Sequence, residues 1–382
     1  TYGFAKYLHD SPPNATYGGF TGTPVDGTIE VFGGVVDAYT MTEAVRDGIT
    51  VNLVYDGRAA RVTINQDKVR EIEEYYDFCV REEANEYQVE ESKKSVANME
   101  IIIGDPDRLR AVAEDFLNHY ETRVEEGATV AGKALFVCSN RYIAYDFYKI
   151  ITELRPEWTE KKICEDGVDL DEKDRKKLKP MEKIKMVMTR NKDDEKELFD
   201  LLGTKDDRKE FDRQFKNPKS NFKIAIVVDM WLTGFDVPEL DTIYIDKPIQ
   251  QHTLIQTISR VNRVCKGKDK GLIVDYIGIK KNMNMALKKY TNFESEEFEG
   301  IEQSIIIVKD QLEVLAQMFH NFNNTGFLNG SPVEQLACLN RAVEYVQLSE
   351  EMETRFMAAV KRMKQAFNLC SSSDKFSDID KD

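Results

Sequence analysis

Four short apolar segments constrain the fold of this chain more than any other feature of its sequence. They are five to seven residues long and read ALFVC (134–138), KIAIVVD (223–229), TIYID (242–246) and GLIVD (271–275). Apolar runs of this length, bounded by polar turns, are typical of strands that are buried on both faces. Here they alternate with helical patterns, which predicts an α/β fold with a parallel sheet covered by helices.

Helical patterns and turn signals organise the rest of the chain. Two strands at 50–55 and 61–64 flank Asp56-Gly57, a dipeptide that is typical of a hairpin turn. Residues 159–183 are interpreted as a charged loop, and the polar tail after 370 as disordered. Helices are predicted at about 140–154, 193–202, 205–217, 251–264, 276–290, 303–322, 332–346 and 349–369.

Changes in composition separate three parts of the chain. Residues 1–36 are rich in turns, 37–291 carry the α/β pattern, and 292–382 are helical after an acidic, Gly-broken stretch. Residues 67–126 form a polar helical insert with 8 Lys/Arg against 18 Asp/Glu, a net charge of −10. We therefore expect a sheet domain with an acidic helical insert, followed by an all-α domain.

Charge and composition restrict the class of partner. The net charge of −15 does not by itself indicate a nucleic-acid binder, but residues 241–290 carry 10 Lys/Arg against 4 Asp/Glu. A basic face of this kind could hold phosphates, and a solvated surface is the alternative. No apolar run approaches the roughly 18 residues that span a bilayer, so no membrane partner is expected. The six cysteines and four histidines are scattered, so no metal site is expected.

Complete catalytic signatures are missing from the sequence. It contains no GxxxxGK[ST] phosphate loop, no GxGxxG fingerprint, no HExxH and no GxSxG motif, and no PD…ExK nuclease core is evident. Any catalysis is therefore expected to be shared with other parts of a larger protein. The start at Thr1, without Met, also suggests a piece of a longer chain.

The strongest functional signal is the octapeptide QTISRVNR at 256–263. Gln256, Arg260 and Arg263 are spaced at i, i+4 and i+7, which places them on one face of the predicted helix. Guanidinium groups bind phosphate bidentately and keep their charge, so this face can meet a phosphate chain held by another domain. A solvated amphipathic helix with exposed arginines is the alternative interpretation.

A second signal, WLTGFDVP at 231–238, follows directly after a predicted strand. The Thr233 hydroxyl and Gly234, which permits close backbone approach, suit contact with a DNA phosphate. Asp236 in the same turn can orient an arginine or a ribose. An ordinary Gly/Pro loop is the alternative interpretation.

Two weaker signals complete the set. Ser139 ends the first apolar strand and begins a helix, whose N-terminus could hold an anion. Thr21-Gly22-Thr23 is by itself only a turn. Because function in parallel sheets sits at the carboxyl ends of strands, we expect Ser139 and the segments 231–238 and 250–263 at that edge.

The order of these segments resembles that of helicase motifs III, IV, V and VI in superfamily 2 helicases and translocases. At a closer level, four segments resemble the restriction (R, motor/endonuclease) subunit of type I restriction-modification enzymes: FTGTP, EAVRDGITVNLVYDGR, MWLTGFDVPELDTIYIDKPIQQHTLIQTISRVNRV and GLIVDYIGI. The resemblance covers residues 1 to about 290, and the block 231–279 is its most specific part.

This resemblance implies a motor with two RecA-like domains and with ATP and Mg²⁺ between them. Residues 1–36 would end the first RecA-like domain, 37–291 would form the second, and 292–382 would start a helical C-terminal domain. The phosphate loop, the DExH motif and a nuclease domain would lie in upstream parts that this chain lacks. The chain alone is therefore expected to be inactive.

The resemblance also implies roles for single residues. Arg263 matches the arginine finger, Arg260 its companion on the phosphates, and Gln256 the first residue of motif VI, in which Ser259 replaces the usual Gly. The remaining assignments follow the other motifs: ATP coupling by Thr21, Gly22, Thr23, Gly234 and Asp236, and DNA backbone binding by Ser139 and Thr233.

The partners that this family implies are duplex DNA and the modification and specificity subunits, in the cytoplasm of a bacterium or archaeon. Two alternatives remain open from the sequence. The chain could come from a different superfamily 2 helicase or remodeller, or it could be a non-catalytic module for subunit assembly.

Overall fold

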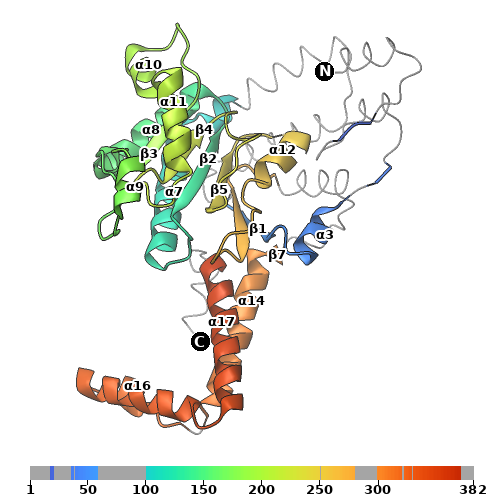
Figure 1. Cartoon of the computed structure of the whole chain (residues 1–382), viewed down its shortest axis with the longest axis vertical. Coiled ribbons are helices and arrows are strands. Elements are labelled where there is room, and N and C mark those ends of the chain that lie inside the picture. Colours follow the sequence, from blue (N-terminus) through green and yellow to red (C-terminus); the bar gives the residue numbers. More distant parts are fainter. Residues whose placement is uncertain are drawn as a thin grey trace. The chain divides into compact units, whose positions relative to one another are not determined.

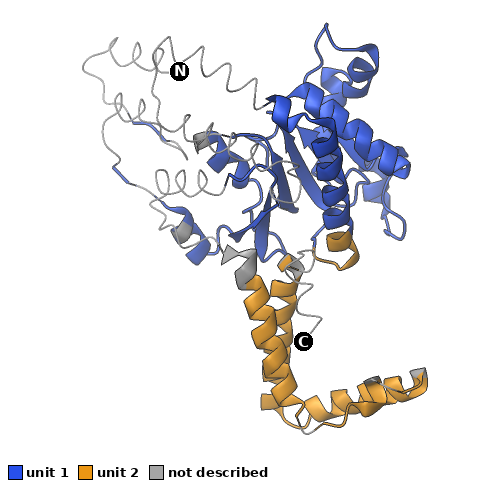
Figure 2. Cartoon of the chain, turned by 180° about the vertical axis from the view of Figure 1, so that it is seen from behind, with its two compact units in different colours: residues 1–121, 129–298 blue, residues 122–128, 299–382 orange. Residues whose placement is uncertain are grey.

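A computed structural model describes residues 18–20, 36–37, 39–58, 100–249, 251–279, 299–320, 322–328 and 330–370. The chain divides into two compact units, which Figure 2 distinguishes by colour. Unit 1 comprises residues 1–121 and 129–298, and unit 2 comprises 122–128 and 299–382. The expected turn at Thr21–Thr23, the strand at 61–64 and the tail after 370 lie outside the described residues.

A parallel sheet forms the centre of unit 1 (Figure 1). Its strands are ordered β3-β4-β2-β5-β6-β1, and every pairing along this order is parallel. The bounds are β1 Asn52–Gly57, β2 Lys133–Cys138, β3 Ile184–Val187, β4 Ile224–Val227, β5 Leu240–Asp246 and β6 Lys270–Asp275. The predicted α/β fold with a RecA-like parallel sheet is therefore confirmed.

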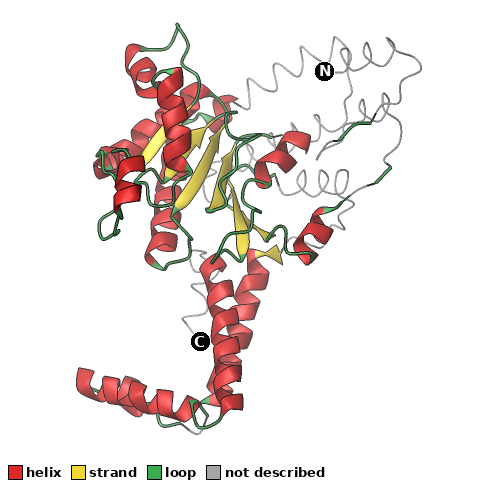
Figure 3. Ribbon diagram, in the orientation of Figure 1, coloured by secondary structure: helices red, strands yellow, loops and turns green. Residues whose placement is uncertain are grey.

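Helices connect these strands, as Figure 3 shows in red. Four of them begin with a side-chain cap; for example, Asn140 accepts from the amides of Tyr142 and Ile143, and Thr204 forms a capping box with Asp207. The bounds are α3 Met41–Arg46, α7 Pro106–Glu125, α8 Arg141–Leu154, the 3₁₀ helix η1 Pro156–Thr159, α9 Glu172–Lys177, α10 Lys196–Leu202, α11 Lys205–Phe215 and α12 Gln251–Ile258.

Three sequence predictions for unit 1 were wrong. The segment at 159–183, expected to be a loop, contains η1's last residue and α9, and the strand β3 follows it directly. The predicted helix at 251–264 ends six residues early, at Ile258. This early end changes the setting of the two arginines. The hairpin turn predicted at Asp56-Gly57 was also wrong, because both residues belong to β1, which pairs in parallel with β6.

Aromatic side chains pack α7 and α8 against the middle of the sheet. Phe136 of β2 stacks on Phe147 of α8 at 4.0 Å between ring centroids, and Phe116 of α7 meets the edge of Phe136 at 5.2 Å. Phe116 also contacts Tyr244 of β5 at 4.8 Å, and Phe136 and Tyr244 are partners in the strand register. Aromatic pairs at these distances add packing energy beyond their burial, so this cluster fixes α7 and α8 on one face.

A buried ion pair joins α7 to the carboxyl end of β5. The guanidinium of Arg108 donates to both carboxylate oxygens of Asp246, at 3.2 and 2.6 Å. The two side chains are 5% and 0% exposed. Arg108 also donates to the carbonyls of Ile103 and Tyr276. Because its donors are paired in this way, the desolvation cost of burying this charge is offset.

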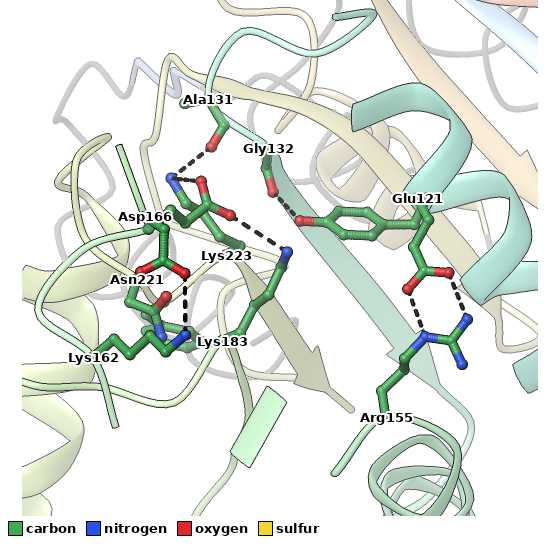
Figure 4. A network of polar contacts seen from close by, with 12 residues as sticks. Glu121, Ala131, Gly132, Arg155, Lys162, Asp166, Lys183, Asn221 and Lys223 are labelled. Carbon is green, nitrogen blue, oxygen red and sulfur yellow. Dashed lines mark hydrogen bonds and ion pairs between the residues drawn. The ribbon is translucent and has the colours of Figure 1, made fainter. Parts of the chain in front are cut away.

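Charged groups at the amino end of the sheet are paired as well (Figure 4). Lys223 donates to the carbonyl of Ala131 at 3.0 Å and lies 3.4 Å from Glu165. Lys183 lies 3.4 Å from the other oxygen of Glu165. Nearby, Arg155 pairs bidentately with Glu121 at 2.6 and 2.7 Å. These contacts satisfy charges where strands β2 and β4 begin, which marks this edge as structural.

Unit 2 is helical apart from the short strand β7 at Glu299–Gly300. Helices α14 and α17 pack together through a small core that includes Ile305, Val308 and Ala366. The bounds are α14 Ile301–Met318, α15 Thr325–Leu328, α16 Pro332–Val346 and α17 Glu350–Cys370. The predicted helical C-terminal region is confirmed. Among the described residues of the whole chain, no helix is long and apolar enough to cross a membrane.

Candidate functional site

Two loops of unit 1 carry five of the ten predicted site residues. The Asp236 loop (residues 228–239) connects β4 to β5, and the Arg263 loop (residues 259–269) connects α12 to β6. Both loops end at the amino ends of their next strands.

An aromatic stack shapes the Asp236 loop. Trp231 adopts a left-handed backbone with φ of 68°, which is rare for a residue other than Gly. Its ring lies flat on Phe235, with centroids 4.1 Å apart and an angle of 3° between the planes. Both stacked rings are buried, whereas Thr233, Gly234 and Asp236 are exposed.

Gly234 also has a left-handed backbone, with φ of 68°, and a Cβ there would meet nothing within 4 Å. Glycine is therefore favoured at this position by its backbone conformation and not by lack of space. The loop can present Thr233 and Asp236 to a ligand, because Gly234 has no side chain and the ring of Phe235 is buried.

The Arg263 loop leaves the helix before both arginines of the motif. After α12 ends at Ile258, Arg263 forms an isolated antiparallel bridge with Thr50, and the amide of Val51 donates to the carbonyl of Asn262 at 2.8 Å. The prediction that Gln256, Arg260 and Arg263 share one helical face was therefore wrong. Pairing with the chain before β1 replaces the last turn of helix, because it satisfies the same backbone groups.

A close backbone approach fixes the path of the Arg263 loop. A Cβ on Gly271, the second residue of β6, would lie 2.2 Å from the carbonyl oxygen of Val261. No side chain fits at that distance, so Gly271 is required for the loop to lie against β6. The loop therefore has a defined course even though it is not helical.

Three side chains of the Arg263 loop contact the Asp236 loop or the start of β5. The Nε of Arg263 lies 3.3 Å from Oδ1 of Asp236. Arg260 donates from Nη1 to the carbonyl oxygen of Phe235. The ammonium of Lys268 donates to the carbonyl oxygens of Pro238, at 3.0 Å, and Leu240, at 2.6 Å. The two loops are thus joined along their length.

The two arginines differ in their surroundings. Arg260 is half-buried and uses Nε to donate to the carbonyl of Gln256 at 3.0 Å. Burial lowers the pKa of Arg260, the positive charge of Arg263 lowers it further, and Asp236 opposes both effects. Arginine nevertheless keeps its proton, so Arg260 remains positively charged and can attract an anion. The Arg263 side chain is 45% exposed, and Asp236 is its one ion-pair partner among the described residues.

Ser139 lies at a different place in unit 1. It follows β2 at the carboxyl edge, where its hydroxyl donates to the carbonyl oxygen of Asp246 at 3.0 Å. A pocket of about 580 Å³ opens there, lined by residues that follow β2, β3 and β4, including Ser139, Asn140, Thr189 and Asn191. Hydroxyl and amide groups of this kind suit a sugar-phosphate backbone.

The predicted site residues therefore fall into two groups. Asp236, Gly234, Arg260 and Arg263 come together at the amino side of β5 and β6, whereas Ser139 lies at the carboxyl edge of β2. The expectation that all of them share the carboxyl edge was wrong, because both loops run back to begin the next strand. Gln256 lies on α12 and contacts Arg260 through its backbone carbonyl. Thr21, Gly22 and Thr23 lie outside the described residues.

Sequence reasoning missed Lys268. It belongs to the segment CKGKDKG, which reads as an ordinary charged turn. The Lys268 ammonium group contacts two carbonyl oxygens about thirty positions earlier in the chain, and no local sequence pattern predicts such a contact.

Comparison with known families matches most of the chain. Residues 130–278 match a family described as type I restriction enzyme subunit R domain 3. Residues 291–382 match the C-terminal part of a family described as type I restriction enzyme HindI endonuclease subunit-like. Residues 1–89 match the family of SWI2/SNF2 ATPases.

Individual relatives carry the same descriptions. The type I restriction enzyme HindI endonuclease subunit of Haemophilus influenzae is 36% identical over 326 residues, which are 83% of this chain and 28% of that protein. The type I restriction enzyme MjaIXP endonuclease subunit of Methanocaldococcus jannaschii is 32% identical over 372 residues, covering 96% of this chain and 33% of that protein. The chain thus spans about a third of the length of these curated relatives.

Among solved structures, a fragment of an HsdR subunit of a type I restriction enzyme from Vibrio vulnificus YJ016 aligns with 14% identity and a TM-score of 0.43. The alignment covers 73% of this chain and 42% of that one. Two of the family matches and both relatives carry a type I restriction enzyme description. The chain belongs to the family of type I restriction enzyme R (endonuclease) subunits.

Proposed function

We propose that this chain is part of the ATP-driven motor with which a type I restriction endonuclease moves duplex DNA. It supplies the arginine finger and contacts to the DNA backbone. The observation that carries this proposal is the exposed guanidinium of Arg263, held 3.3 Å from Asp236 beside the half-buried Arg260. Two positive charges are thus held in one place with one of them open to solvent.

ATP would supply the phosphate chain that these arginines bind. The residues present fit this ligand, because Arg263 is 45% exposed and its Nε is the one atom of its guanidinium paired with a described residue. Its remaining N–H groups can donate bidentately to phosphate oxygens. Arg260, tied to the carbonyls of Gln256 and Phe235, keeps its charge close to the same place.

The role of these arginines is electrostatic. During phosphoryl transfer negative charge spreads over the phosphate oxygens, and a positioned arginine stabilises it, with effects of about 10³–10⁵ in rate in well-studied enzymes. Asp236 and Gly234 would couple the state of the nucleotide to the rest of the domain. In this proposal Mg²⁺ is held by the upstream domain. Among the described residues of this chain, no group of three or more His, Cys, Asp or Glu side chains is placed to hold a metal ion.

The domain assignment belongs to the same proposal. Residues 1–36, with Thr21, Gly22 and Thr23, would end the first RecA-like domain, 37–291 would be the second, and 292–382 a helical C-terminal domain. The match of 1–89 to SWI2/SNF2 ATPases supports the use of ATP by the longer protein.

Duplex DNA is the proposed polymer that the motor moves. Ser139 and Thr233 would contact its phosphates, which carry no base information, so these residues would not select a sequence. The pocket beside Ser139 supports this role, because hydroxyl and amide side chains that follow β2 and β3, together with Arg141, line it beside the carboxylates of Glu100 and Asp229. The modification and specificity subunits are the proposed protein partners, and the cytoplasm of a bacterium or archaeon is the proposed location.

ATP hydrolysis by these 382 residues, with and without duplex DNA, tests the proposal together with the same assay on the full-length subunit. We expect no turnover by the chain alone, because its sequence has no phosphate loop, and DNA-stimulated turnover by the full-length subunit. Clear turnover by the chain alone would contradict the shared site. A folded full-length subunit without turnover would favour a non-catalytic assembly module.

A further inference from the structure

Lys268 occupies an unusual position for a lysine. It is 6% exposed, and lysines are almost never buried so fully unless their charge is paired. The described partners of its ammonium group are two carbonyl oxygens, those of Pro238 and Leu240, at 3.0 and 2.6 Å. A buried charge held by neutral acceptors costs stability compared with an apolar residue, which calls for a reason other than stability.

The electrostatic setting of Lys268 agrees with this cost. Burial lowers its pKa to about 8, although Asp241, Cys265 and Glu239 oppose the shift. The charge of Arg263 lowers the pKa of Lys268 as well, which shows that the two cations are close enough to repel each other. Two like charges are thus kept on one short loop.

The backbone around Lys268 transmits its position to Arg263. The amide of Lys268 donates to the carbonyl of Cys265 at 3.0 Å, and the two residues also form an isolated bridge. This tight turn begins two residues after Arg263. At its other end, Arg263 is bridged to Thr50. The short stretch from Arg263 to Lys268 is therefore anchored at both ends.

The carbonyl oxygens that Lys268 binds lie where the Asp236 loop enters β5. Pro238 lies two residues after Asp236, and Leu240 is the first residue of β5. The ammonium group thus fixes the exit of the Asp236 loop to the exit of the Arg263 loop. The ion pair between Asp236 and Arg263 lies between this anchor and the contact from Arg260 to Phe235.

We propose that Lys268 is a positioning residue for Arg263, which it holds in register with Asp236 by fastening the two loops together through the carbonyl oxygens of Pro238 and Leu240. This inference rests on the proposed role of Arg263 at the phosphates of ATP. Lys268 itself does not touch the nucleotide. Removing the Lys268 ammonium group leaves the guanidinium of Arg263 unchanged but lets the loop that carries it shift. A small displacement of a catalytic group lowers the reaction rate strongly.

The test uses the full-length subunit with duplex DNA and compares Lys268→Met with a matched control, Lys266→Met. Lys266 lies on the same loop two residues earlier but is exposed. For Lys268→Met we expect kcat for ATP hydrolysis to fall about tenfold with less than a twofold change in KM for ATP. We expect Lys266→Met to match the wild type.

A double variant separates positioning from a general loss of structure. Asp236→Asn removes the ion pair to Arg263. In this variant the register between Arg263 and residue 236, which Lys268 is proposed to maintain, no longer matters. We expect the double variant Asp236→Asn, Lys268→Met to lose no more activity than the more severe single variant. Multiplied losses in the double variant would overturn the proposal, as would an unchanged kcat in folded Lys268→Met protein.

A second substitution guards against failure of Lys268→Met to fold. Lys268→Gln keeps an amide that can donate to one of the two carbonyls, and we expect its kcat to fall about threefold. An unchanged kcat for this variant would also overturn the proposal. The proposed function is tested by a different result, which is ATP turnover by the wild-type full-length subunit. Absence of that turnover would contradict the proposed function before any Lys268 variant is compared.

Discussion

The Nε of Arg263 lies 3.3 Å from Oδ1 of Asp236, and this ion pair joins two loops that are 27 positions apart in the sequence. Both side chains are partly open to solvent, at 45% and 65% exposure. The pair therefore holds the arginine in a defined place while leaving most of its guanidinium accessible. That combination suits a residue that must exchange one anionic partner for another.

Loss of this ion pair should affect stability very little. Exposed ion pairs contribute about 0–1 kcal/mol, since water and salt screen them. We expect Asp236→Asn to lower the free energy of unfolding of the chain by less than about 1 kcal/mol. Urea unfolding followed by circular dichroism measures this change. A loss of several kcal/mol would mean that Asp236 supports the fold and is not free to exchange partners.

The buried pair between Arg108 and Asp246 should behave in the opposite way. Removing one partner leaves a charge uncompensated at a site with 0% exposure, so we expect Arg108→Met to cost about 3–5 kcal/mol in urea unfolding. Arg110→Met, on the same helix, is the control. Arg110 is 48% exposed and should cost less than about 1 kcal/mol. Equal effects would show that Arg108 is not buried as described.

Gly271 should not tolerate a side chain. Its Cβ would lie 2.2 Å from the carbonyl oxygen of Val261, and backbone cannot yield as a flexible side chain would. We expect Gly271→Ala to cost at least about 1–3 kcal/mol in thermal or urea unfolding. Gly267→Ala, at φ of 85° with nothing within 4 Å, should cost about 1–2 kcal/mol from backbone strain alone. A neutral Gly271→Ala would contradict the close approach of the Arg263 loop to β6.

Lys268 should give the folded chain a pH dependence in the alkaline range. Its folded pKa is about 8, because burial disfavours the charge, against about 10.4 for an unfolded lysine. Between these two pKa values the unfolded chain binds more protons at Lys268 than the folded chain does. The free energy of unfolding therefore rises with pH over this range, and the stability gained from the neutral Lys268 is lost as pH falls through 8.

The measurement compares urea unfolding of wild type and Lys268→Met at several values between pH 7.5 and about 9.5. We expect the stability of the wild type relative to the variant to increase over this range. Other buried lysines, such as Lys133, act equally in both proteins and cancel. A difference that stays flat or decreases would contradict a desolvated ammonium at this position.

Apolar runs predicted the sheet because a strand that is buried on both faces carries apolar side chains on both faces. The strands β2, β4, β5 and β6 lie within a few residues of their predicted bounds. Strand β3 escaped prediction because it is four residues long and Lys185 interrupts it. The Lys185 ammonium reaches Glu182 at 2.8 Å, so the charge leaves the apolar environment of the strand.

The sequence did not predict the geometry of the candidate site, and the roles of its residues remain a proposal. The spacing of Arg260 and Arg263 fits a helix, and local sequence holds no signal that α12 ends at Ile258. The end is set by Thr50 and Val51, which pair with the chain at Arg263 and Asn262 from more than two hundred positions away. Tertiary pairing overrides helix propensity here, as it often does.

The most direct test of the proposed motor function is DNA-stimulated ATP hydrolysis by the full-length subunit with Arg263→Ala. We expect turnover to fall by about 10³ or more, as when an arginine finger is removed, while thermal unfolding and assembly with partner subunits remain as in the wild type. Turnover that stays within a few-fold of the wild type in a folded Arg263→Ala subunit would contradict the assignment of Arg263 to the nucleotide.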